Sequence, residues 1–337
     1  MTAVRYTPKR AAEILGRTVE KLGKHPEVGA MFRGREGLSP ADLVRAREVL
    51  GIRPPAIGSR RQLFLNFKGG TGKTSLSTAY AYRLWELGYR VLVVDLDSQG
   101  HASKSLGVEG TDYPKTLFDS LIRKVPLRDV LVPTAYPGLD LVPSNLSMST
   151  IELALMPLSG REFKLRLALK DLAESEAGRP YDFTVMDAPP SFGLLNLNAL
   201  MAANDLIVPV LADFLSFHGL RLLFETVQSL EEDLQHVLDH IFIVINGFNA
   251  SFKLAKEARE ALETHYKEFL LQGVVRQCTK FAQASSEGTP IFALDPASKG
   301  AIDIAAMVNE LLSAVAREGS SLTPSKRGSP RAPGERA

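Results

Sequence analysis

Residues 63–74 read LFLNFKGGTGKT, a short apolar run that leads into a glycine-rich turn ending in Lys73-Thr74. The run Leu63–Phe67 predicts a buried strand, and residues 74–87 after the turn predict a helix. Glycines let a backbone approach a ligand closely, and successive N–H groups in such a turn point inward. The helix N-terminus adds a field that favours anions. This stretch therefore predicts a loop that holds the phosphates of a nucleotide.

The two residues that close the loop have distinct expected roles. We expect Lys73 to meet the β- and γ-phosphates of ATP and the Thr74 hydroxyl to ligate Mg²⁺. Phe67 occupies the place of the first glycine in the common G-x-x-x-x-G-K-[ST] pattern, and Lys68 follows it. A chance glycine-rich turn is the alternative, and the order of strand, loop and helix argues against it. Contacts to ATP are expected from Gly69, Gly70, Thr71, Gly72, Lys73, Thr74 and Ser75.

Acidic residues follow two of the apolar runs. Asp95-Leu96-Asp97 continues the run VLVV, and Asp187 ends the run FTVMD. Ligands of open α/β sheets bind at the carboxyl ends of the strands. We therefore expect Asp187 to hold Mg²⁺ through water and Asp97 to orient the attacking water. The alternative for each is a carboxylate that only caps the following turn.

Strand-like and helix-like stretches alternate over most of the chain. Further candidate strands are Val91–Asp95, Leu139–Val142, Phe183–Asp187, Leu206–Val210 and Ile241–Ile245. Continuous apolar strands separated by helical stretches such as Arg161–Glu174 are typical of parallel sheets. The sequence predicts an α/β fold of the P-loop NTPase kind, in which helices cover both faces of a mostly parallel sheet.

The composition is that of an ordinary globular protein, with 45% apolar and 23% charged residues among 337. Cys278 is the only cysteine, which excludes an intrachain disulfide and fits a cytoplasmic location. No apolar run is long enough to span a membrane, so no membrane association is expected. Residues 1–61 carry a net charge of +7 and residues 319–337 one of +3, against −8 in between. Basic ends on an acidic body suggest that the ends meet a polyanion.

Four segments are predicted along the chain. Residues 1–51 read as short helices: one begins at Thr7-Pro8, another near Thr18, and a third is capped by Ser39 and closed by Gly51. Residues 52–61, with two prolines and a Gly-Ser pair, read as a linker. Residues 62–318 form the nucleotide-binding domain, and the Pro- and Ser-rich residues 319–337 are expected to be a disordered basic tail.

Several motifs together resemble the ParA family of partition ATPases, which carry a deviant Walker A loop. They are KGGTGKTS (68–75), VVDLDSQGHAS (93–103), VMDAPPS (185–191) and SSEGTPIFALDPASKGA (285–301). The resemblance covers about residues 62–312. It implies a homodimer that sandwiches ATP, with Lys68 reaching the partner's nucleotide and Asn246 near the adenine. Ser98 departs from the family, which usually has proline there, and so does Arg276-Gln277-Cys278.

The resemblance also implies DNA binding without sequence preference, by scattered basic residues near the C-terminus. Lys253, Lys256 and Lys280 are the candidates in the nucleotide-binding domain. The N-terminal segment resembles a winged-helix or MerR-like helix-turn-helix, with Arg17, Lys21 and Lys24 on its basic second helix. A small helical dimerisation cap is the alternative for this segment. If it reads DNA, phosphate contacts should dominate its affinity.

The leading interpretation is a Mg²⁺-dependent ATPase that partitions or positions a plasmid, a chromosome or a protein cargo. The resemblance implies a nucleoid-associated dimer and a ParB-like or cargo-linked activator of hydrolysis. One alternative is an ATP-switched transcriptional autorepressor. The other is a MinD-like ATPase on a membrane surface, against which the absence of a basic amphipathic C-terminal helix counts.

Overall fold

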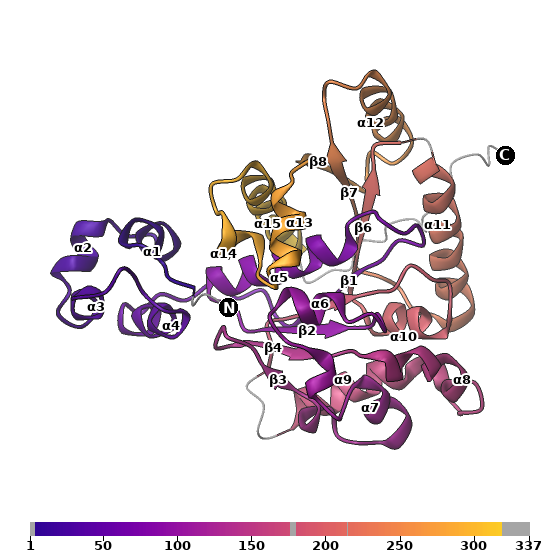
Figure 1. Cartoon of the computed structure of the whole chain (residues 1–337). Coiled ribbons are helices and arrows are strands. Elements are labelled where there is room, and N and C mark those ends of the chain that lie inside the picture. The colour runs from indigo at the N-terminus through magenta and orange to yellow at the C-terminus, as the bar shows by residue number, and fades with distance from the viewer. Residues whose placement is uncertain (1–3, 176–179, 214, 319–337) are drawn as a thin grey trace.

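In the computed structural model, which describes residues 4–175, 180–213 and 215–318, one sheet forms the centre of the molecule. Helices lie on both faces of the sheet, and four N-terminal helices form a lobe at one side (Figure 1). The predicted α/β architecture is confirmed. The tail predicted for residues 319–337 lies outside the described residues.

Eight strands make the sheet in the order β3-β4-β2-β5-β1-β6-β7-β8. Every neighbouring pair is parallel except β3 with β4. The central strands are buried on both faces, which explains why their sequences are continuous apolar runs. The strands are β1 Arg60–Phe64, β2 Val91–Asp95, β3 Val132–Pro133, β4 Leu139–Val142, β5 Phe183–Asp187, β6 Asp205–Leu211, β7 His240–Phe248 and β8 Leu270–Arg276.

Successive residues of each strand serve opposite faces of the sheet. Leu63 packs with one buried cluster and Phe64 with the other, because neighbouring side chains of a strand point in opposite directions. Helices α5, α14 and α15 contribute to the cluster of Phe64, and α9, α10 and α11 contribute to the cluster of Leu63. The helices after β1 are α5 Lys73–Leu87, α6 His101–Ser105, α7 Leu117–Arg123, α8 Ile151–Leu155, α9 Lys164–Glu174, α10 Leu194–Ala202, α11 Leu215–Leu234, α12 Lys253–His265, α13 Lys280–Ser286, α14 Ile291–Leu294 and α15 Lys299–Glu318.

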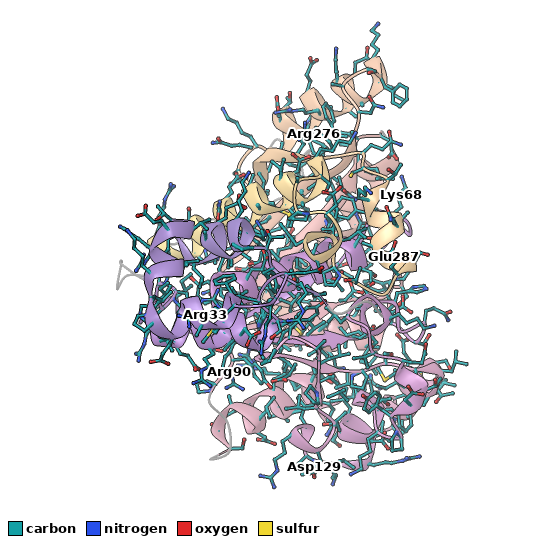
Figure 2. All side chains as sticks on the ribbon, turned by 60° about the vertical axis from the view of Figure 1, so that its left-hand side comes forward. Arg33, Lys68, Arg90, Asp129, Arg276 and Glu287 are labelled. Carbon is teal, nitrogen blue, oxygen red and sulfur yellow. The ribbon has the colours of Figure 1, made fainter. Side chains whose placement is uncertain are left out.

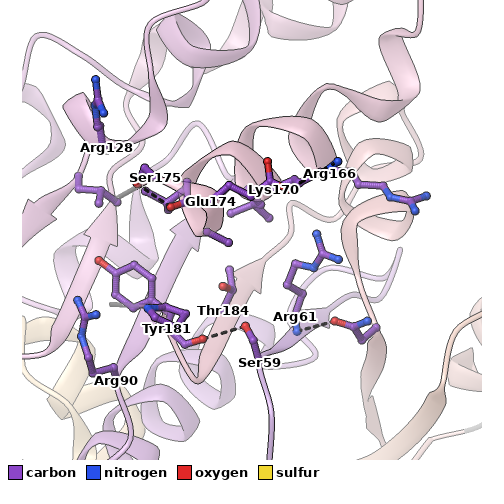
Figure 3. Close-up of a pocket in the computed structure, with 16 residues that line it drawn as sticks. Ser59, Arg61, Arg90, Arg128, Arg166, Lys170, Glu174, Ser175, Tyr181 and Thr184 are labelled. Carbon is purple, nitrogen blue, oxygen red and sulfur yellow. Dashed lines mark hydrogen bonds and ion pairs between the residues drawn. The ribbon is translucent and has the colours of Figure 1, made fainter. Parts of the chain in front are cut away.

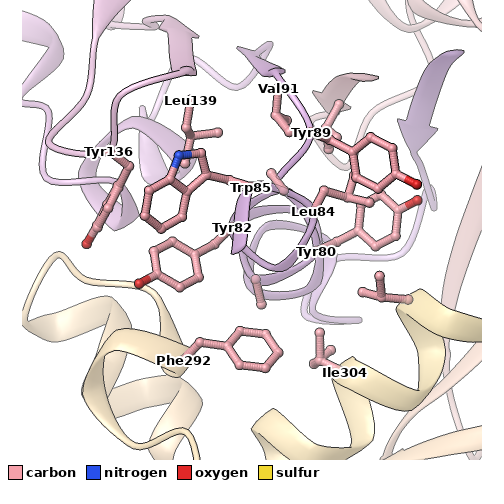
Figure 4. Close-up of a cluster of buried hydrophobic side chains, with 14 of the residues drawn as sticks. Tyr80, Tyr82, Leu84, Trp85, Tyr89, Val91, Tyr136, Leu139, Phe292 and Ile304 are labelled. Atoms are coloured by element: carbon pink, nitrogen blue, oxygen red, sulfur yellow. The ribbon is translucent and has the colours of Figure 1, made fainter. Parts of the chain in front are cut away.

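Helix α5 is buried over most of its length and carries an aromatic cluster (Figure 4). The ring of Tyr82 lies 4.9 Å from that of Tyr136 and 5.4 Å from that of Trp85, centroid to centroid. The indole N–H of Trp85 donates to the Pro137 carbonyl at 2.9 Å. These contacts fix α5 against the loop that leads into β4, so the helix behind the glycine loop has little freedom to shift.

The N-terminal lobe contains four short helices with the caps that its sequence predicts. Thr7, Thr18 and Ser39 each accept a backbone hydrogen bond as N-cap, and Ser39 forms a capping box with Asp42. Gly16 ends the first helix in the left-handed conformation, where glycine is favoured. The helices are α1 Pro8–Leu15, α2 Val19–Lys24, α3 Pro26–Phe32 and α4 Pro40–Val49.

This lobe packs directly on the far end of α5. The fully buried carboxylate of Glu86 accepts two hydrogen bonds from Arg10, at 2.8 and 2.9 Å, and pairs with Arg83 at 2.7 Å. Arg47 donates to the Glu86 carbonyl, and the hydroxyls of Tyr6 and Tyr82 are hydrogen-bonded. Apolar residues of the lobe belong to the same buried cluster as α5. Residues 4–50 are therefore folded against the α/β body.

Some elements differ from the sequence-based expectations. β1 spans Arg60–Phe64 instead of Leu63–Phe67, because its ladder with β5 begins at Arg60 and Phe183. The linker predicted for 52–61 therefore ends before Arg60. Helix α3 had not been anticipated, although His25 and Pro26 provide its start. The helix-turn-helix and dimerisation-cap interpretations of residues 1–51 both stay predictions.

No helix in the described part of the chain is both long and apolar enough to cross a membrane.

We predict that Glu86→Ala lowers the free energy of unfolding by about 3 kcal/mol, because it leaves the guanidinium groups of Arg10 and Arg83 without their buried partner. Urea unfolding can be followed by the fluorescence of Trp85, the single tryptophan, which lies beside this contact. The control is Lys24→Ala, which breaks an exposed ion pair with Glu20 and should change little. Equal small effects of the two substitutions would show that the lobe does not depend on Glu86.

Candidate functional site

The glycine loop lies between the end of β1 and the start of α5, at the carboxyl edge of the sheet. Gly70 and Gly72 have φ angles of +74° and +88°, a region that favours glycine. A Cβ atom on Gly72 would overlap the side-chain amide of Asn246. The hydroxyl oxygen of Thr71 is buried without a hydrogen-bond partner among the described residues. The loop thus has the open backbone and an unsatisfied polar atom that suit a phosphate ligand.

Lys73 is the first residue of α5, and its side chain is buried. Its ammonium donates to the carbonyl oxygen of Lys68 at 3.2 Å, which folds the side chain over the loop. Burial lowers the pKa of Lys73, and the carboxylates of Asp187 and Asp97 partly offset that effect. Its contact with the phosphates of ATP stays a prediction.

Asp187 ends β5 beside the first turn of α5. Its two carboxylate oxygens accept hydrogen bonds from Thr74 at 2.7 Å and from Ser77 at 2.9 Å. Burial, together with the neighbouring carboxylate of Asp95, raises the pKa of Asp187 to about 7. The hydroxyl of Thr74 and the carboxylate of Asp187 therefore lie together, and both are oxygen ligands of the kind that Mg²⁺ prefers.

Among the described residues, no group of three or more His, Cys, Asp or Glu side chains could hold a metal ion. Mg²⁺ in nucleotide sites keeps several waters and takes phosphate oxygens in addition to one or two protein ligands. The pair of Thr74 and Asp187 is thus an appropriate donor set for a nucleotide-bound Mg²⁺.

Asp95 and Asp97 lie at the end of β2, next to Asp187 in the sheet. Asp95 is buried and accepts hydrogen bonds from the backbone and hydroxyl of Ser103, at 2.8 and 2.7 Å. Burial raises the pKa of Asp95 to about 6. Asp97 is half-exposed, and its carboxylate accepts a hydrogen bond from the backbone of Gln99 at 3.0 Å. Asp95 is therefore held by hydrogen bonds inside the protein, whereas the half-exposed Asp97 is near enough to Lys73 to oppose the lowering of that lysine's pKa by burial.

Lys68 lies at the outer rim of the loop, away from the N-terminal lobe that carries Arg33 (Figure 2). Its ammonium pairs with the carboxylate of Asp213, at 2.8 and 3.0 Å, and both side chains are partly exposed. Asp213 also accepts hydrogen bonds from the backbone and hydroxyl of Ser216. The backbone N–H of Lys68 donates to Asn66, whose amide is itself bonded to Pro209. In the single chain, Lys68 is thus held within its own subunit.

Sequence reasoning missed Asn66 and Asp213. Both act on Lys68, and Asp213 is 145 positions away along the chain. Asp213 follows the end of β6, at the same sheet edge as the loop, so its position after an apolar strand was the available signal.

Asn246 belongs to β7, and its amide donates to the carbonyl of Thr71 at 2.8 Å. It therefore holds the glycine loop from β7, which β6 separates from β1 in the sheet. The contact with adenine expected for Asn246 stays a prediction. Ser75 is half-buried in the first turn of α5, and Gly69 is exposed on the loop.

The candidate DNA-binding residues lie on separate elements. Lys253 and Lys256 are exposed on α12, and Lys253 pairs with Glu257 at 3.4 Å. Lys280 begins α13 and donates to Gln283 at 2.9 Å. In the N-terminal lobe, Arg17, Lys21 and Lys24 are exposed on and just before α2. Their part in DNA binding stays a prediction.

Comparison with known proteins identifies relatives over most of the chain. A family model described as an AAA domain matches residues 61–240. The cell division protein PomZ of Myxococcus xanthus is 64% identical over 312 residues, which cover 93% of this chain and 94% of PomZ. The chromosome partitioning protein ParA of the same organism is 32% identical over 247 residues, 73% of this chain and 86% of ParA.

Among solved structures, cobyrinic acid a,c-diamide synthase from Mycobacterium smegmatis, with a bound ATP analogue and magnesium, has a TM-score of 0.64. It is 27% identical to this chain, covering 79% of this chain and 98% of the synthase.

We predict that Gly72→Ala lowers the free energy of unfolding of the nucleotide-free protein by about 2 kcal/mol, because alanine is strained at this positive φ and meets Asn246. Thermal unfolding measures the effect. Gly69→Ala is the matched control: its φ is not positive and the nearest atom, on Pro190, is 4.0 Å away. The double variant Gly72→Ala/Asn246→Ala should recover part of the loss. Equal stability of the Gly72 and Gly69 variants would contradict the proposed strain.

Proposed function

The chain belongs to the ParA family of P-loop ATPases, and from that premise we propose that it is a Mg²⁺-dependent ATPase that positions a cargo in cell division or DNA partition. In this proposal ATP joins two subunits into a dimer that binds DNA, and an activator protein stimulates hydrolysis. The observation that carries it is the convergence of Lys73, Thr74 and Asp187 on the glycine loop. The similarity to PomZ favours a role in cell division.

Different residues at the loop are proposed to contact different parts of the nucleotide. Backbone N–H groups of residues 69–74 surround the phosphates, and Lys73 supplies a positive charge at the β- and γ-phosphates. Thr74 and Asp187 would hold Mg²⁺, directly or through water, and the bound metal would supply positive charge beside the phosphates. Asp97, which is half-exposed beside Lys73, orients the water that attacks the γ-phosphate. The synthase complex with an ATP analogue and magnesium supports this assignment of ligands.

Lys68 is proposed to act across the dimer. Its ion pair with Asp213 is partly exposed, and such pairs are weak. Phosphate groups of the partner subunit's nucleotide offer a stronger acceptor, so Lys68 exchanges Asp213 for that nucleotide when the dimer forms. The deviant Walker A assignment rests on this role.

DNA binding is proposed to depend on exposed basic residues that contact phosphates without reading bases. An ATP-switched repressor is a second candidate function, favoured by the net charge of +7 on residues 1–61 and by the exposed Arg17, Lys21 and Lys24. The two functions are compatible within one chain.

We predict that substitutions of the two loop lysines impair different steps, namely ATP binding for Lys73 and dimer formation for Lys68. Lys73→Ala should weaken ATP binding about 100-fold, because a charged hydrogen-bond donor to phosphate is lost. Lys68→Ala should keep ATP binding but prevent the ATP-dependent dimer. Equilibrium binding of a fluorescent ATP analogue and light scattering separate these effects.

Asp213→Asn is the matched control for Lys68. It removes the ion pair within the subunit but keeps the ammonium, so the dimer should still form. Loss of the dimer in both Lys68→Ala and Asp213→Asn would mean that the ion pair itself is required, and the role of Lys68 across the dimer would be rejected.

Asp97→Ala should slow hydrolysis and trap an ATP-bound dimer on DNA, since the attacking water loses its orienting carboxylate. Phosphate release measures turnover, with Asp129→Ala as an exposed control carboxylate. Binding of the trapped dimer to random duplex should have a slope of about −5 in log K against log salt. This assumes about six phosphate contacts from Lys253, Lys256 and Lys280 of two subunits. Unchanged turnover in Asp97→Ala would remove this residue from the mechanism.

The contribution of the N-terminal lobe is best tested by substitution, because its removal would expose the apolar side of α5. If the lobe reads an operator, replacing Arg17, Lys21 and Lys24 by alanine should abolish preference for operator DNA. Binding to random duplex should persist. Equal loss on both duplexes would reject specific recognition by the lobe.

A further inference from the structure

A basic cavity of about 670 Å³ opens at the edge of the sheet opposite the glycine loop (Figure 3). It lies where β1 and β5 begin, and helix α9 forms one wall. Arg61 extends from β1 toward α9, which carries Arg166 (Figure 3). Because the glycine loop follows the other end of β1, this cavity is separate from the proposed nucleotide site.

The charges that line the cavity are strongly unbalanced. Among the described lining residues, five basic side chains accompany one acidic side chain, Glu174. The basic residues are Arg61, Arg90, Arg128, Arg166 and Lys170. The described lining thus carries a net charge of +4, which is unfavourable unless anions neutralise it.

Two of these cations have long ion pairs. The N–O distances are 3.6 Å from Arg128 to Asp129 and 3.7 Å from Lys170 to Glu174. Such pairs near the surface contribute little and leave the cations available to a stronger acceptor.

Arg61 and Arg166 have no acidic partner among the described residues, which sets Arg61 apart from the neighbouring Arg60. Arg60 pairs with Asp205 and Asp239. Burial, together with the nearby Arg166, lowers the pKa of Arg61. The guanidinium of the exposed Arg166 thus repels that of the half-buried Arg61, and a ligand with several negative charges would relieve that repulsion.

The shape and the remaining lining favour a small molecule. The volume is within the range of small-molecule sites, and Leu169 and Leu172 of α9 add apolar surface. The ring of Tyr181 lies under the guanidinium of Arg90, 4.7 Å from ring centroid to Cζ, and stiffens one end. Guanidinium groups bind phosphate through paired hydrogen bonds, so clustered arginines suit this anion.

We propose that this cavity is a second ligand site, which binds a small molecule carrying several phosphate groups. A compact polyphosphate matches the net charge of the lining, whereas a monocarboxylate would balance only one of its charges. A concave site of this size encloses such a molecule, whereas duplex DNA would meet the basic side chains only at the rim.

Isothermal titration of the full chain with inorganic tripolyphosphate tests the proposal. The protein carries Lys73→Ala, so that the glycine loop contributes little. We expect a binding event that Arg61→Ala/Arg166→Ala weakens by roughly tenfold or more. The matched control Lys9→Ala/Arg33→Ala removes two exposed cations of the N-terminal lobe and should leave the affinity unchanged.

Folding of the variants is checked by circular dichroism and by ATP binding with Lys73 restored. If the double arginine variant does not fold, the variant Lys170→Glu is used in its place. Lys170 is exposed, so this substitution reverses one charge of the lining and leaves Arg61 unchanged. Lys170→Glu should also weaken tripolyphosphate binding.

Three results would overturn the proposal. One is the absence of tripolyphosphate binding to the Lys73→Ala protein. The second is equal weakening by the cavity variant and the control variant. The third is a loss of affinity for a short DNA duplex in the cavity variant while tripolyphosphate binding is unaffected, which would assign these arginines to DNA.

Discussion

The hydrogen bonds from Thr74 and Ser77 to Asp187 tie the first turn of α5 to the end of a central strand, and the geometry of the glycine loop depends on them. Asp187 and Asp95 are both fully buried side by side, and burial raises the pKa of each. Two adjacent buried carboxyl groups disfavour full ionisation, whereas a nearby cation favours it. The nucleotide edge of the sheet is therefore built to accept positive charge when phosphates arrive with their metal.

Helix α5 connects this edge to the N-terminal lobe. Its first residue, Lys73, closes the loop, and Glu86 near its other end forms an ion pair with Arg10 of the lobe. The two ends are about 20 Å apart at 1.5 Å per residue. Aromatic packing around Tyr82 and Trp85 leaves α5 little room to move, so the lobe and the nucleotide site share one rigid element.

The two edges of the sheet differ in charge for a structural reason. Strands that are parallel bring their carboxyl ends to one edge, where Asp95 and Asp187 gather, and their amino ends to the other, where Arg61 is the second residue of β1. The acidic edge is compensated internally by Lys73 and by hydroxyl donors. At the other edge, no described acidic residue forms an ion pair with Arg61 or Arg166. A bound anion is therefore the simplest way to neutralise the positive charge of these two side chains.

The sequence by itself determined the glycine loop, the strand ends that carry Asp95, Asp97 and Asp187, and the α/β class, because these depend on local spacing and apolar runs. Cap residues such as Thr7 and Ser39 also set helix starts locally. The extent of β1 could not be read this way, since pairing with β5, more than a hundred residues later, decides where the strand begins.

Only the tertiary structure decided which distant side chains meet. It brings together the ion pairs of Asp213 with Lys68 and of Glu86 with Arg10. It also forms the hydrogen bond from the amide of Asn246 to the carbonyl of Thr71. It also gathered arginines from β1 and α9 around one cavity. These contacts depend on the order of the strands in the sheet. Strand order follows from the packing of the whole sheet, and local sequence patterns do not encode that packing.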